Sequence, residues 1–339
     1  MTNPGERFDR ATAEAALAVA VRAPSIHNTQ PWAWRLGPDG LALLADRTRQ
    51  LEVADPDGHS LLVSCGAALH LTEVALRAGG WHVETTVLPD PADPDTLATF
   101  RPEGREQPDD RALAEVDAAL RRRSDRRPFA QHEVPAVTME ALRAASSDPS
   151  AWVDFPSGED QRIDLAVAVS WADRVERDDT AYQAEMKRWL HDPDVHAMVD
   201  GVPVDAIPHV PADNPRHTDV PLRDFEVGVT GREMIERNVD ERPLIAVMFT
   251  DSDVARDHLQ SGQAMMQLMI EADLAGLSTC PLSQAVDFAA FRSRVQGLMG
   301  WIGYPQMMLR VGYPIAPIDE LARTPRREPA AVLQVADDA

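Results

Sequence analysis

The most informative stretch of the chain is Ala23-Pro24-Ser25-Ile26-His27-Asn28-Thr29-Gln30-Pro31-Trp32. A proline near each end fixes the backbone torsion φ at those positions. Between the prolines, serine, asparagine, threonine and glutamine supply hydrogen-bond donors and acceptors. A rigid loop of this kind suits a planar heterocycle with a polar edge. It equally suits an ordinary capped turn, because Asn and Ser are common turn residues, and periodicity does not decide between the two.

Regular elements are predicted outward from this loop. An alanine-rich helix over residues 10–22 precedes it, and a hairpin over residues 32–44 follows, with Gly-Pro-Asp-Gly at its turn. A helix over residues 60–79 and a strand over residues 81–88 come next. Residues 89–110 are rich in Pro and Asp and are predicted to be a linker. The chain is therefore divided into halves at residues 1–108 and 109–339.

The second half is predicted to contain further helices and strands and one long irregular insertion. The insertion spans about residues 178–232, holds many Pro, Asp and His residues, and is expected to act as a lid over a site. The helices are predicted at residues 111–122, 138–145, 159–176, 180–191 and 259–276, and the strands at residues 244–249 and 307–311.

An internal similarity favours duplication over chance. Residues 64–79 align without gaps on residues 261–276, and most of the identical residues fall on one helix face. The identical pairs are Ser64/Ser261, Ala67/Ala264, Leu71/Leu268, Ala75/Ala272, Ala78/Ala275 and Gly79/Gly276.

The bulk composition excludes several classes of function. The chain has 339 residues, enough for two domains or one fused unit, and 44% of them are apolar. Its 33 Lys and Arg residues face 55 Asp and Glu residues, a net charge of -22, so nucleic-acid and membrane-surface binding are not expected. Only two cysteines, Cys65 and Cys280, and no recognisable signal or membrane span favour the cytoplasm.

Against this acidic background, two basic clusters stand out. Arg122, Arg123, Ser124 and Arg126 offer guanidinium groups and a hydroxyl that can hold a phosphate dianion. The pair Arg326-Arg327 could close the same pocket from the end of the chain. Taken alone, an arginine run at a helix end is more often a solvated terminus that complements the helix dipole. No metal site is expected, because the histidines of the insertion are irregularly spaced.

Together these segments resemble the nitroreductase family. Residues 24–32, PSIHNTQPW, are similar to its SPSxxNxQPW segment, and residues 122–126, RRSDR, to its RRSxR phosphate-binding motif. The forms RAPSIHNTQPW and RRSDRRPF resemble the Acg-like branch from actinobacteria. The resemblance implies an α+β, nitroreductase-like fold with two pseudo-symmetric halves, each with a central, mostly antiparallel sheet flanked by helices. Residues 261–279, 309–314 and 326–329 are similar to the family's interface helix, last strand and closing RxP element.

The order of the motifs departs from the family pattern. In ordinary members the arginine motif precedes the loop motif in one subunit, and two subunits share two FMN molecules. Here the loop motif lies in the first half and the arginine motif in the second. The resemblance thus implies one FMN site between the halves of a fused pseudo-dimer that can work as a monomer.

The family also implies residue roles, none of them catalytic in the sense of a reacting side chain. Pro281, Leu282 and Ser283 match a loop whose backbone N–H faces flavin N5, although Ser283-Gln284 stands where many members have Glu-Gly. The first half would bind the ribityl chain and the ring through Pro24, Ser25, Ile26 and Asn28. The second half would hold the phosphate through Arg122, Arg123, Ser124, Arg126, Arg327 and also Arg326.

Two functions remain open at this point, with a third behind them. The first is an FMN-dependent oxidoreductase that takes electrons from NAD(P)H and reduces a nitro compound, a quinone or a similar small acceptor. The second is an FMN-sequestering or storage protein whose lid covers the flavin and allows little turnover. The third is a flavin-free interaction protein.

Overall fold

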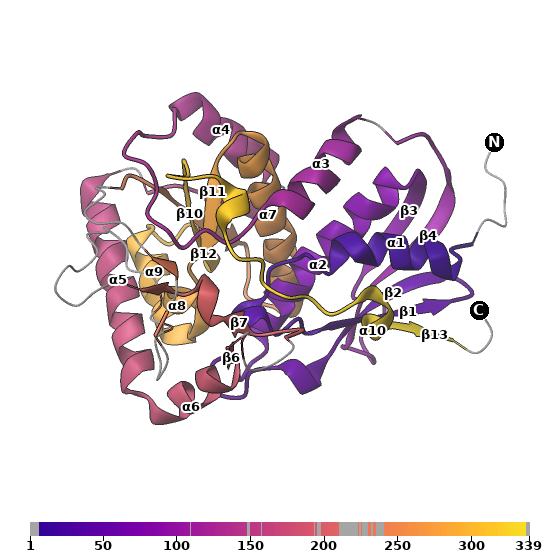
Figure 1. Cartoon of the computed structure of the whole chain (residues 1–339), viewed down its shortest axis with the longest axis horizontal. Coiled ribbons are helices and arrows are strands. Elements are labelled where there is room, and N and C mark those ends of the chain that lie inside the picture. The colour runs from indigo at the N-terminus through magenta and orange to yellow at the C-terminus, as the bar shows by residue number, and fades with distance from the viewer. Residues whose placement is uncertain are drawn as a thin grey trace.

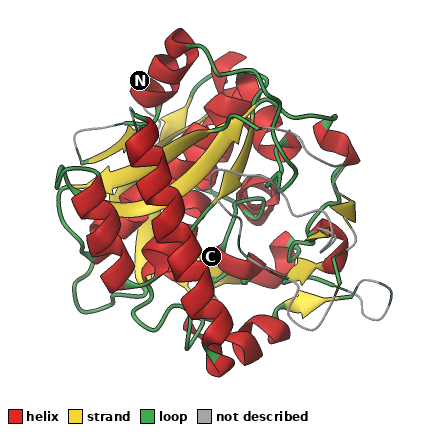
Figure 2. Ribbon diagram, turned by 90° about the vertical axis from the view of Figure 1, so that its left-hand side faces the viewer, coloured by secondary structure: helices red, strands yellow, loops and turns green. Residues whose placement is uncertain are grey.

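Two sheets flank a central pair of long helices, α2 (His59–Ala78) and α7 (Ala255–Leu274), as Figure 1 shows. The computed structural model describes residues 7–108, 110–147, 150–156, 158–192, 194, 198–209, 223, 225, 230–231, 233–234 and 241–336. Seen from the side of the second half, helices lie in front of the strands (Figure 2). The largest cluster of buried apolar residues draws members from both halves, so the two sheets share one core.

The first half follows the predicted order with one correction. The predicted linker over residues 89–110 contains a strand, β4, which pairs with β2 and β3. Its first residues, Thr96 to Phe100, are apolar or β-branched, and the flanking Pro and Asp residues mask them in the sequence. The elements are α1 (Arg10–Ala20), η1 (Ile26–Asn28), β1 (Trp32–Gly37), β2 (Gly40–Ala45), η2 (Arg47–Arg49), α2, β3 (Trp81–Val87), β4 (Thr96–Arg105) and α3 (Asp110–Arg121).

The second half repeats the topology of the first. Its sheet has the order β11-β12-β10-β5, all antiparallel, and the first sheet has the order β13-β1-β2-β4-β3. Read from the other edge, β5-β10-β12-β11 corresponds to β1-β2-β4-β3, with α7 in the place of α2. This arrangement confirms the α+β fold with two pseudo-symmetric halves. The elements are α4 (Ala136–Ala145), β5 (Ala151–Asp154), α5 (Glu159–Asp178), β10 (Leu244–Thr250), α7, β11 (Ser278–Pro281), α8 (Gln284–Asp287), α9 (Ala289–Leu298), β12 (Tyr304–Gly312) and η4 (Ile318–Glu320).

The central helices cross at two glycines, Gly66 and Gly262. A Cβ atom on Gly66 would lie 2.0 Å from the carbonyl oxygen of Leu259, and one on Gly262 would lie 2.0 Å from that of Val63. These reciprocal contacts pair residue 66 with 262 and residue 63 with 259. Gly80 and Gly276, the left-handed glycines that follow the two helices, are separated along the chain by the same number of residues as these pairs. The ungapped alignment of residues 64–79 with 261–276 is therefore out of register by one position.

Burial in this crossing explains the composition of α2. By length and apolar composition the helix could span a membrane, and among the described residues it alone passes that test. In the fold 78% of its most apolar window is buried inside the protein, largely against α7. Its apolar character therefore serves the core.

The end of the chain crosses back to the first half. After α10 (Pro329–Val332), the strand β13 (Leu333–Val335) pairs in parallel with β1, with Trp34 opposite Leu333. Figure 1 shows this yellow segment lying beside the indigo strands. The last strand thus lies after the predicted boundary at residues 108 and 109 in sequence, but it belongs to the sheet of the first half.

The described parts of the insertion pack on the first half. Glu185 of α6 (Thr180–Arg188) accepts hydrogen bonds of 2.7–3.2 Å from the backbone N–H groups of Glu52, Val53 and Ala54. Leu51 and Ala54 share a small apolar cluster with residues of the insertion such as Tyr182 and Phe225. Much of residues 210–232 lies outside the described residues. The other elements here are β6 (Leu190–His191), β7 (Val202–Pro203), η3 (Val204–Ala206), β8 (Pro208–His209) and β9 (Glu233–Met234).

Candidate functional site

A deep cavity lies where the two halves and the insertion meet. It encloses about 1200 Å³ of empty space when its open mouth is included, and the centre of a water molecule can occupy about 130 Å³ of that. Both predicted half-sites line it. The predicted residues that do so are Pro24, Ser25, Ile26, Asn28, Arg122, Arg123, Ser124, Arg126, Pro281, Ser283 and Arg326.

The loop at residues 24–30 is held in an unusual backbone conformation. His27, Asn28 and Gln30 have positive φ angles of 45°, 56° and 51°, a region that residues with a side chain rarely occupy. Two serine hydroxyls hold it in place, because Ile26 N donates to Ser64 Oγ at 3.2 Å and Gln30 N donates to Ser25 Oγ at 3.0 Å. Such strain, maintained by surrounding hydrogen bonds, is typical of a binding loop.

Asn28 joins three segments of the chain. Its Nδ2 donates to the carbonyl oxygen of Gly201 in the insertion at 2.8 Å and to that of Pro325 at 3.0 Å. Its Oδ1 is buried and has no hydrogen-bond partner among the residues that the structure describes. A buried acceptor without a donor is costly, so this oxygen is suited to a ligand N–H or O–H group.

Arginines gather at one end of the cavity. Arg22, Arg122, Arg123, Arg323 and Arg326 all line it. The Nε atoms of Arg122, Arg123 and Arg326 are buried and have no hydrogen-bond partner in the described part of the chain. Burial, reinforced by the charge of neighbouring arginines, lowers the pKa of Arg122 to about 10 and that of Arg326 well below its ordinary value. An anion with several acceptor oxygens would relieve both the repulsion and the unpaired donors.

Local structure places this cluster across the seam between the halves. Ser124 forms a β-bridge with Thr279, and Asp125 N donates to the carbonyl oxygen of Thr279 at 2.9 Å. Arg122 Nη2 donates to the carbonyl oxygen of Arg22 in the first half at 2.6 Å. The second half therefore presents its arginines directly beside the start of the amide-rich loop.

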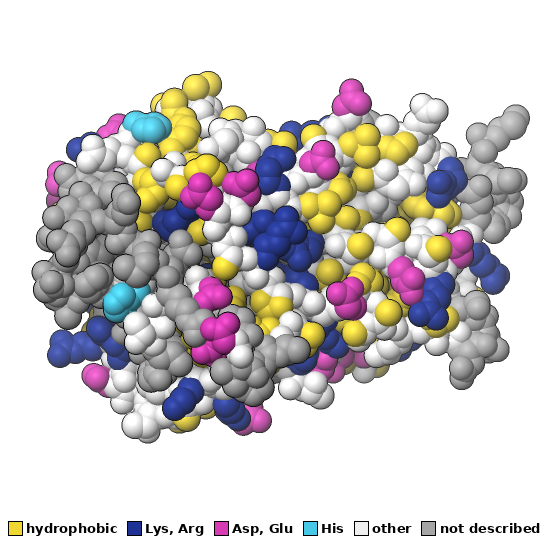
Figure 3. Space-filling view, viewed as in Figure 1, with side chains coloured by type: hydrophobic (Ala, Val, Ile, Leu, Met, Phe, Trp, Pro, Cys, Tyr) yellow, Lys and Arg dark blue, Asp and Glu magenta, His cyan; other side chains and the backbone are white. Residues whose placement is uncertain are grey.

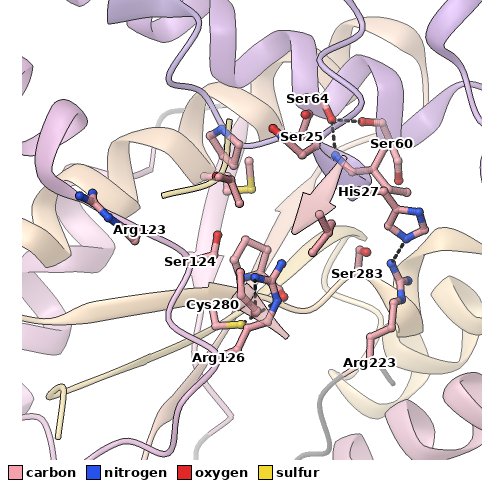
Figure 4. A pocket seen from close by; sticks show the side chains of 18 of the residues that line it. Ser25, His27, Ser60, Ser64, Arg123, Ser124, Arg126, Arg223, Cys280 and Ser283 are labelled. Atoms are coloured by element: carbon pink, nitrogen blue, oxygen red, sulfur yellow. Dashed lines mark hydrogen bonds between the residues drawn. The ribbon is translucent and has the colours of Figure 1, made fainter. Parts of the chain in front are cut away.

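Arg126 lies apart from these arginines, at the other end of the cavity. Its guanidinium carbon lies 5.1 Å from the ring centroid of Phe225, and its Nη1 donates to the carbonyl oxygen of Ala206 at 3.5 Å. Figure 4 shows Arg126 beside Cys280, with Arg123 on the opposite side of Ser124. The position of Arg126 does not favour the phosphate role expected from the motif.

At that end a buried ion-pair network holds Arg223 of the insertion. Arg223 donates to Glu176 at 3.0 and 3.2 Å and to Asp287. It also donates to His27 Nε2 at 2.9 Å, as Figure 4 shows. Burial alone would lower the pKa of Arg223, but the carboxylates of Glu176 and Asp287 raise it well above its ordinary value. Burial, with the charges of Arg223 and Arg126, lowers the pKa of His27 well below its usual range. The imidazole is thus neutral and accepts from the guanidinium.

Two predicted residues do not line the cavity. The Leu282 side chain is 1% exposed and packs in the apolar cluster of the second sheet. Arg327 is turned away, lies 3.6 Å from Asp46, and donates to the carbonyl oxygens of Gln30 and Trp32. Arg327 therefore joins the C-terminal segment to the loop and faces away from the cavity.

Several lining residues escaped the sequence prediction. Arg22 and His27 lie within the quoted motif and could have been included. Arg223, Phe225 and Arg323 lie in segments without periodicity, and only the tertiary fold brings them to the cavity. Among the described residues, no group of three His, Cys, Asp or Glu side chains is placed to hold a metal ion.

Comparison with known proteins assigns the family. No family model matches the chain. A protein of Mycobacterium tuberculosis named "Putative NAD(P)H nitroreductase Rv3131" is 35% identical over 327 residues, covering 96% of this chain and 92% of its own. A second protein of that organism, named "Putative NAD(P)H nitroreductase acg", is 30% identical over 314 residues, covering 93% and 92%.

Among solved structures, the FMN-dependent nitroreductase NfnB from Mycobacterium smegmatis, in complex with NADPH, is 19% identical to this chain. The match covers 67% of this chain and 100% of that one, with a TM-score of 0.40. The two curated relatives, whose similarity runs over nearly the whole sequence, carry the assignment: the chain belongs to the nitroreductase-like family that includes the Acg-like proteins.

Proposed function

We propose that this protein binds FMN in the cavity between its halves and acts as an NAD(P)H-dependent flavin oxidoreductase. The carrying observation is the set of buried, unpartnered guanidinium Nε atoms at one end of the cavity, with the strained amide-rich loop at its side. A phosphate monoester dianion matches the first feature and the polar edge of a flavin matches the second. The residues present therefore fit FMN.

The residues divide into two groups by position. Arg122 and Arg326, with the Ser124 hydroxyl, would hold the phosphate, and Arg123 lies next to them. Ser25 and Asn28 would contact the ribityl chain and the ring from the first half, with Asn28 Oδ1 accepting a hydrogen bond. We assign Arg126 to the ring, where a positive charge would stabilise negative charge that develops on reduction.

FMN bound there would supply the redox chemistry, hydride acceptance from NAD(P)H and electron transfer to an acceptor. The protein would bind the flavin, orient its ring and exclude water from it, and no described side chain needs to react. The names of the relatives support the nicotinamide donor. The acceptor would be a nitro compound, a quinone or a similar small molecule, and the cytoplasm is the expected location.

Anaerobic reduction tests this proposal. The purified protein should carry, or take up from added FMN, a flavin absorbing near 450 nm, and NAD(P)H should bleach that band promptly. A colourless protein that takes up no FMN would overturn the proposal and favour the flavin-free alternative.

Storage of FMN is the second candidate, and the insertion favours it. Val202, Ala206, Arg223 and Phe225 all line the cavity, and Arg223 is fixed by buried carboxylates. A segment held in this way could keep hydride donors from the ring. Under this alternative, the bound flavin is reduced by dithionite, and NADPH leaves it oxidised in the same anaerobic experiment.

We also propose that the halves are a fused pseudo-dimer with one flavin site. The matching strand orders and the reciprocal glycine contacts support it. A stoichiometry of one FMN per chain is therefore expected, and two per chain would contradict it.

A further inference from the structure

The mouth of the cavity carries more positive charge than one phosphate needs. Arg122 is 8% exposed, and its Nε and that of Arg326 are buried and find no hydrogen-bond acceptor within the described ranges. With the Ser124 hydroxyl, these two guanidinium groups already supply enough donors for the terminal oxygens of a phosphate monoester. The remaining arginines of the cluster are thus not required by the FMN phosphate.

Arg22 and Arg323 are the outer members of the cluster. Both line the cavity, Arg323 is exposed, and Arg22 is half-buried. Within the described part of the chain, neither side chain has a hydrogen bond or ion pair, although acidic residues outnumber basic ones by 55 to 33. Figure 3 shows basic side chains gathered near the middle of this face, over the path of the segment that joins η4 to α10 in Figure 1.

Keeping these two cations together costs free energy. Burial, and then the charge of Arg323, lowers the pKa of Arg22. In a protein with a net charge of -22, unpaired arginines at an open cavity produce a local positive field that attracts anionic ligands. An anion other than the FMN phosphate would offset this cost.

We propose that Arg22 and Arg323 form a second phosphate subsite at the cavity mouth, for a phosphate group of a ligand beyond FMN. The proposed reaction offers two sources of such a group. One is the nicotinamide dinucleotide, and the other is an adenylylated flavin such as FAD. The inference rests on the proposed function, because it assumes that the FMN phosphate occupies the site formed by Arg122 and Arg326.

The test compares two double variants with the same loss of charge. Arg22→Ala/Arg323→Ala removes the subsite, and Arg35→Ala/Arg174→Ala removes two exposed arginines from other elements. FMN and FAD affinities are measured on the flavin-free protein, and NADPH and NADH affinities on the FMN-loaded protein. Thermal unfolding confirms that both variants are folded, and the single variant Arg323→Gln serves if the double variant is not.

Removing the subsite should leave the FMN affinity within about twofold of the wild-type value. It should weaken the binding of NADPH or FAD by about tenfold, which corresponds to about 1.4 kcal/mol. The ligand whose affinity falls identifies the source of the phosphate group. A larger loss of affinity for NADPH than for NADH would place the 2′-phosphate of NADPH in the second subsite. The control should change none of these affinities.

Unchanged affinities for FAD and both nicotinamides in the subsite variant would overturn the second subsite while leaving FMN binding intact. An equal loss of FMN affinity would also overturn it, because all the arginines would then serve one phosphate. A wild-type protein that binds no flavin would instead refute the proposed function itself.

Discussion

At the scale of single residues, the candidate site is defined by arginine charges that form no ion pair with a carboxylate among the described residues. Arg122 and Arg326 lie against backbone carbonyls of the first half, yet their Nε atoms are unsatisfied. Unpaired buried cations lower stability unless a ligand supplies the counter-charge. The cluster therefore indicates an anion more strongly than the sequence motif does.

Substituting Arg122 should selectively weaken binding of the phosphorylated flavin. Arg122→Ala is expected to cost roughly 1.5–3 kcal/mol of FMN binding, the range for a charge-assisted hydrogen bond, and to leave riboflavin binding unchanged. Fluorescence titration of the flavin-free protein measures both affinities. Arg121→Ala is the matched control, since Arg121 is an exposed neighbour that pairs with Asp273. Equal losses for FMN and riboflavin would argue against phosphate contact.

His27 should make stability depend on pH. Its pKa is depressed in the folded protein, so the unfolded chain binds more protons below about pH 6.5. The His27 contribution is therefore present above that pH and is lost as the pH falls. Urea unfolding of wild type and His27→Gln between pH 5 and 8 isolates it, because Asp55 and Glu176, whose pKa values burial raises to about 7, are common to both proteins. Parallel stability curves for the two proteins would refute the prediction.

At the scale of elements, the α2–α7 crossing fixes how the halves meet. Gly66 and Gly262 allow the helix backbones to touch, and a side chain at either position would displace a carbonyl group of the opposite helix. The cavity depends on this contact, since Ser64 of α2 and Met265 of α7 both line it. A change at the crossing would propagate to the site.

Gly262→Ala should lower the free energy of unfolding by roughly 1–3 kcal/mol or more, the typical cost of overpacking a core. Urea denaturation measures it. Gly158→Ala is a suitable control, because a Cβ atom there meets nothing within 4 Å. Equal denaturation midpoints for Gly262→Ala and wild type would mean that the helices separate at no cost.

The helices and the first hairpin were largely predictable, and the pairings between distant segments were not. Residues 10–22, 60–79 and 159–176 have clear helical periodicity, and α1, α2 and α5 confirm them to within two residues. β4 escaped because its apolar residues lie between Pro and Asp clusters. The internal alignment matched alanine-rich faces one position out of register, because small residues recur on several faces of both helices.

The candidate site was predictable only where it depends on local sequence patterns. The loop and arginine motifs are local patterns, and both line the cavity. Arg126 belongs to the arginine motif and Arg327 to the C-terminal RxP element. The directions of the two side chains, however, depend on contacts with Phe225 and Asp46, which are distant in sequence. Local sequence carries no information on such contacts.

At the scale of the whole molecule, the two halves are interlocked by the C-terminal segment. It passes the loop at Asn28, brings Arg326 to the cavity, and ends as β13 at the edge of the first sheet. Residues of both halves therefore line the cavity, and without the crossing the first sheet lacks its edge strand β13. The proposed flavin site therefore lies at the seam between the two halves.

Ending the chain after Arg327 should destabilise the first half while leaving the arginine cluster in place. It removes β13, which leaves β1 as an exposed edge, and it removes the buried Val332, worth roughly 1.5–3 kcal/mol. A lower melting temperature and a tendency to aggregate in size-exclusion chromatography are expected. A chain ending after Ala336 keeps β13 and is the control. Equal melting temperatures for the two truncated chains would contradict the role of β13.

A crystal structure of the protein with FMN tests the central claim most directly. The flavin phosphate should lie between the guanidinium groups of Arg122 and Arg326, with the ring between the Asn28 loop and Arg126, one molecule to each chain. A flavin bound elsewhere, or held by residues of one half alone, would contradict the account.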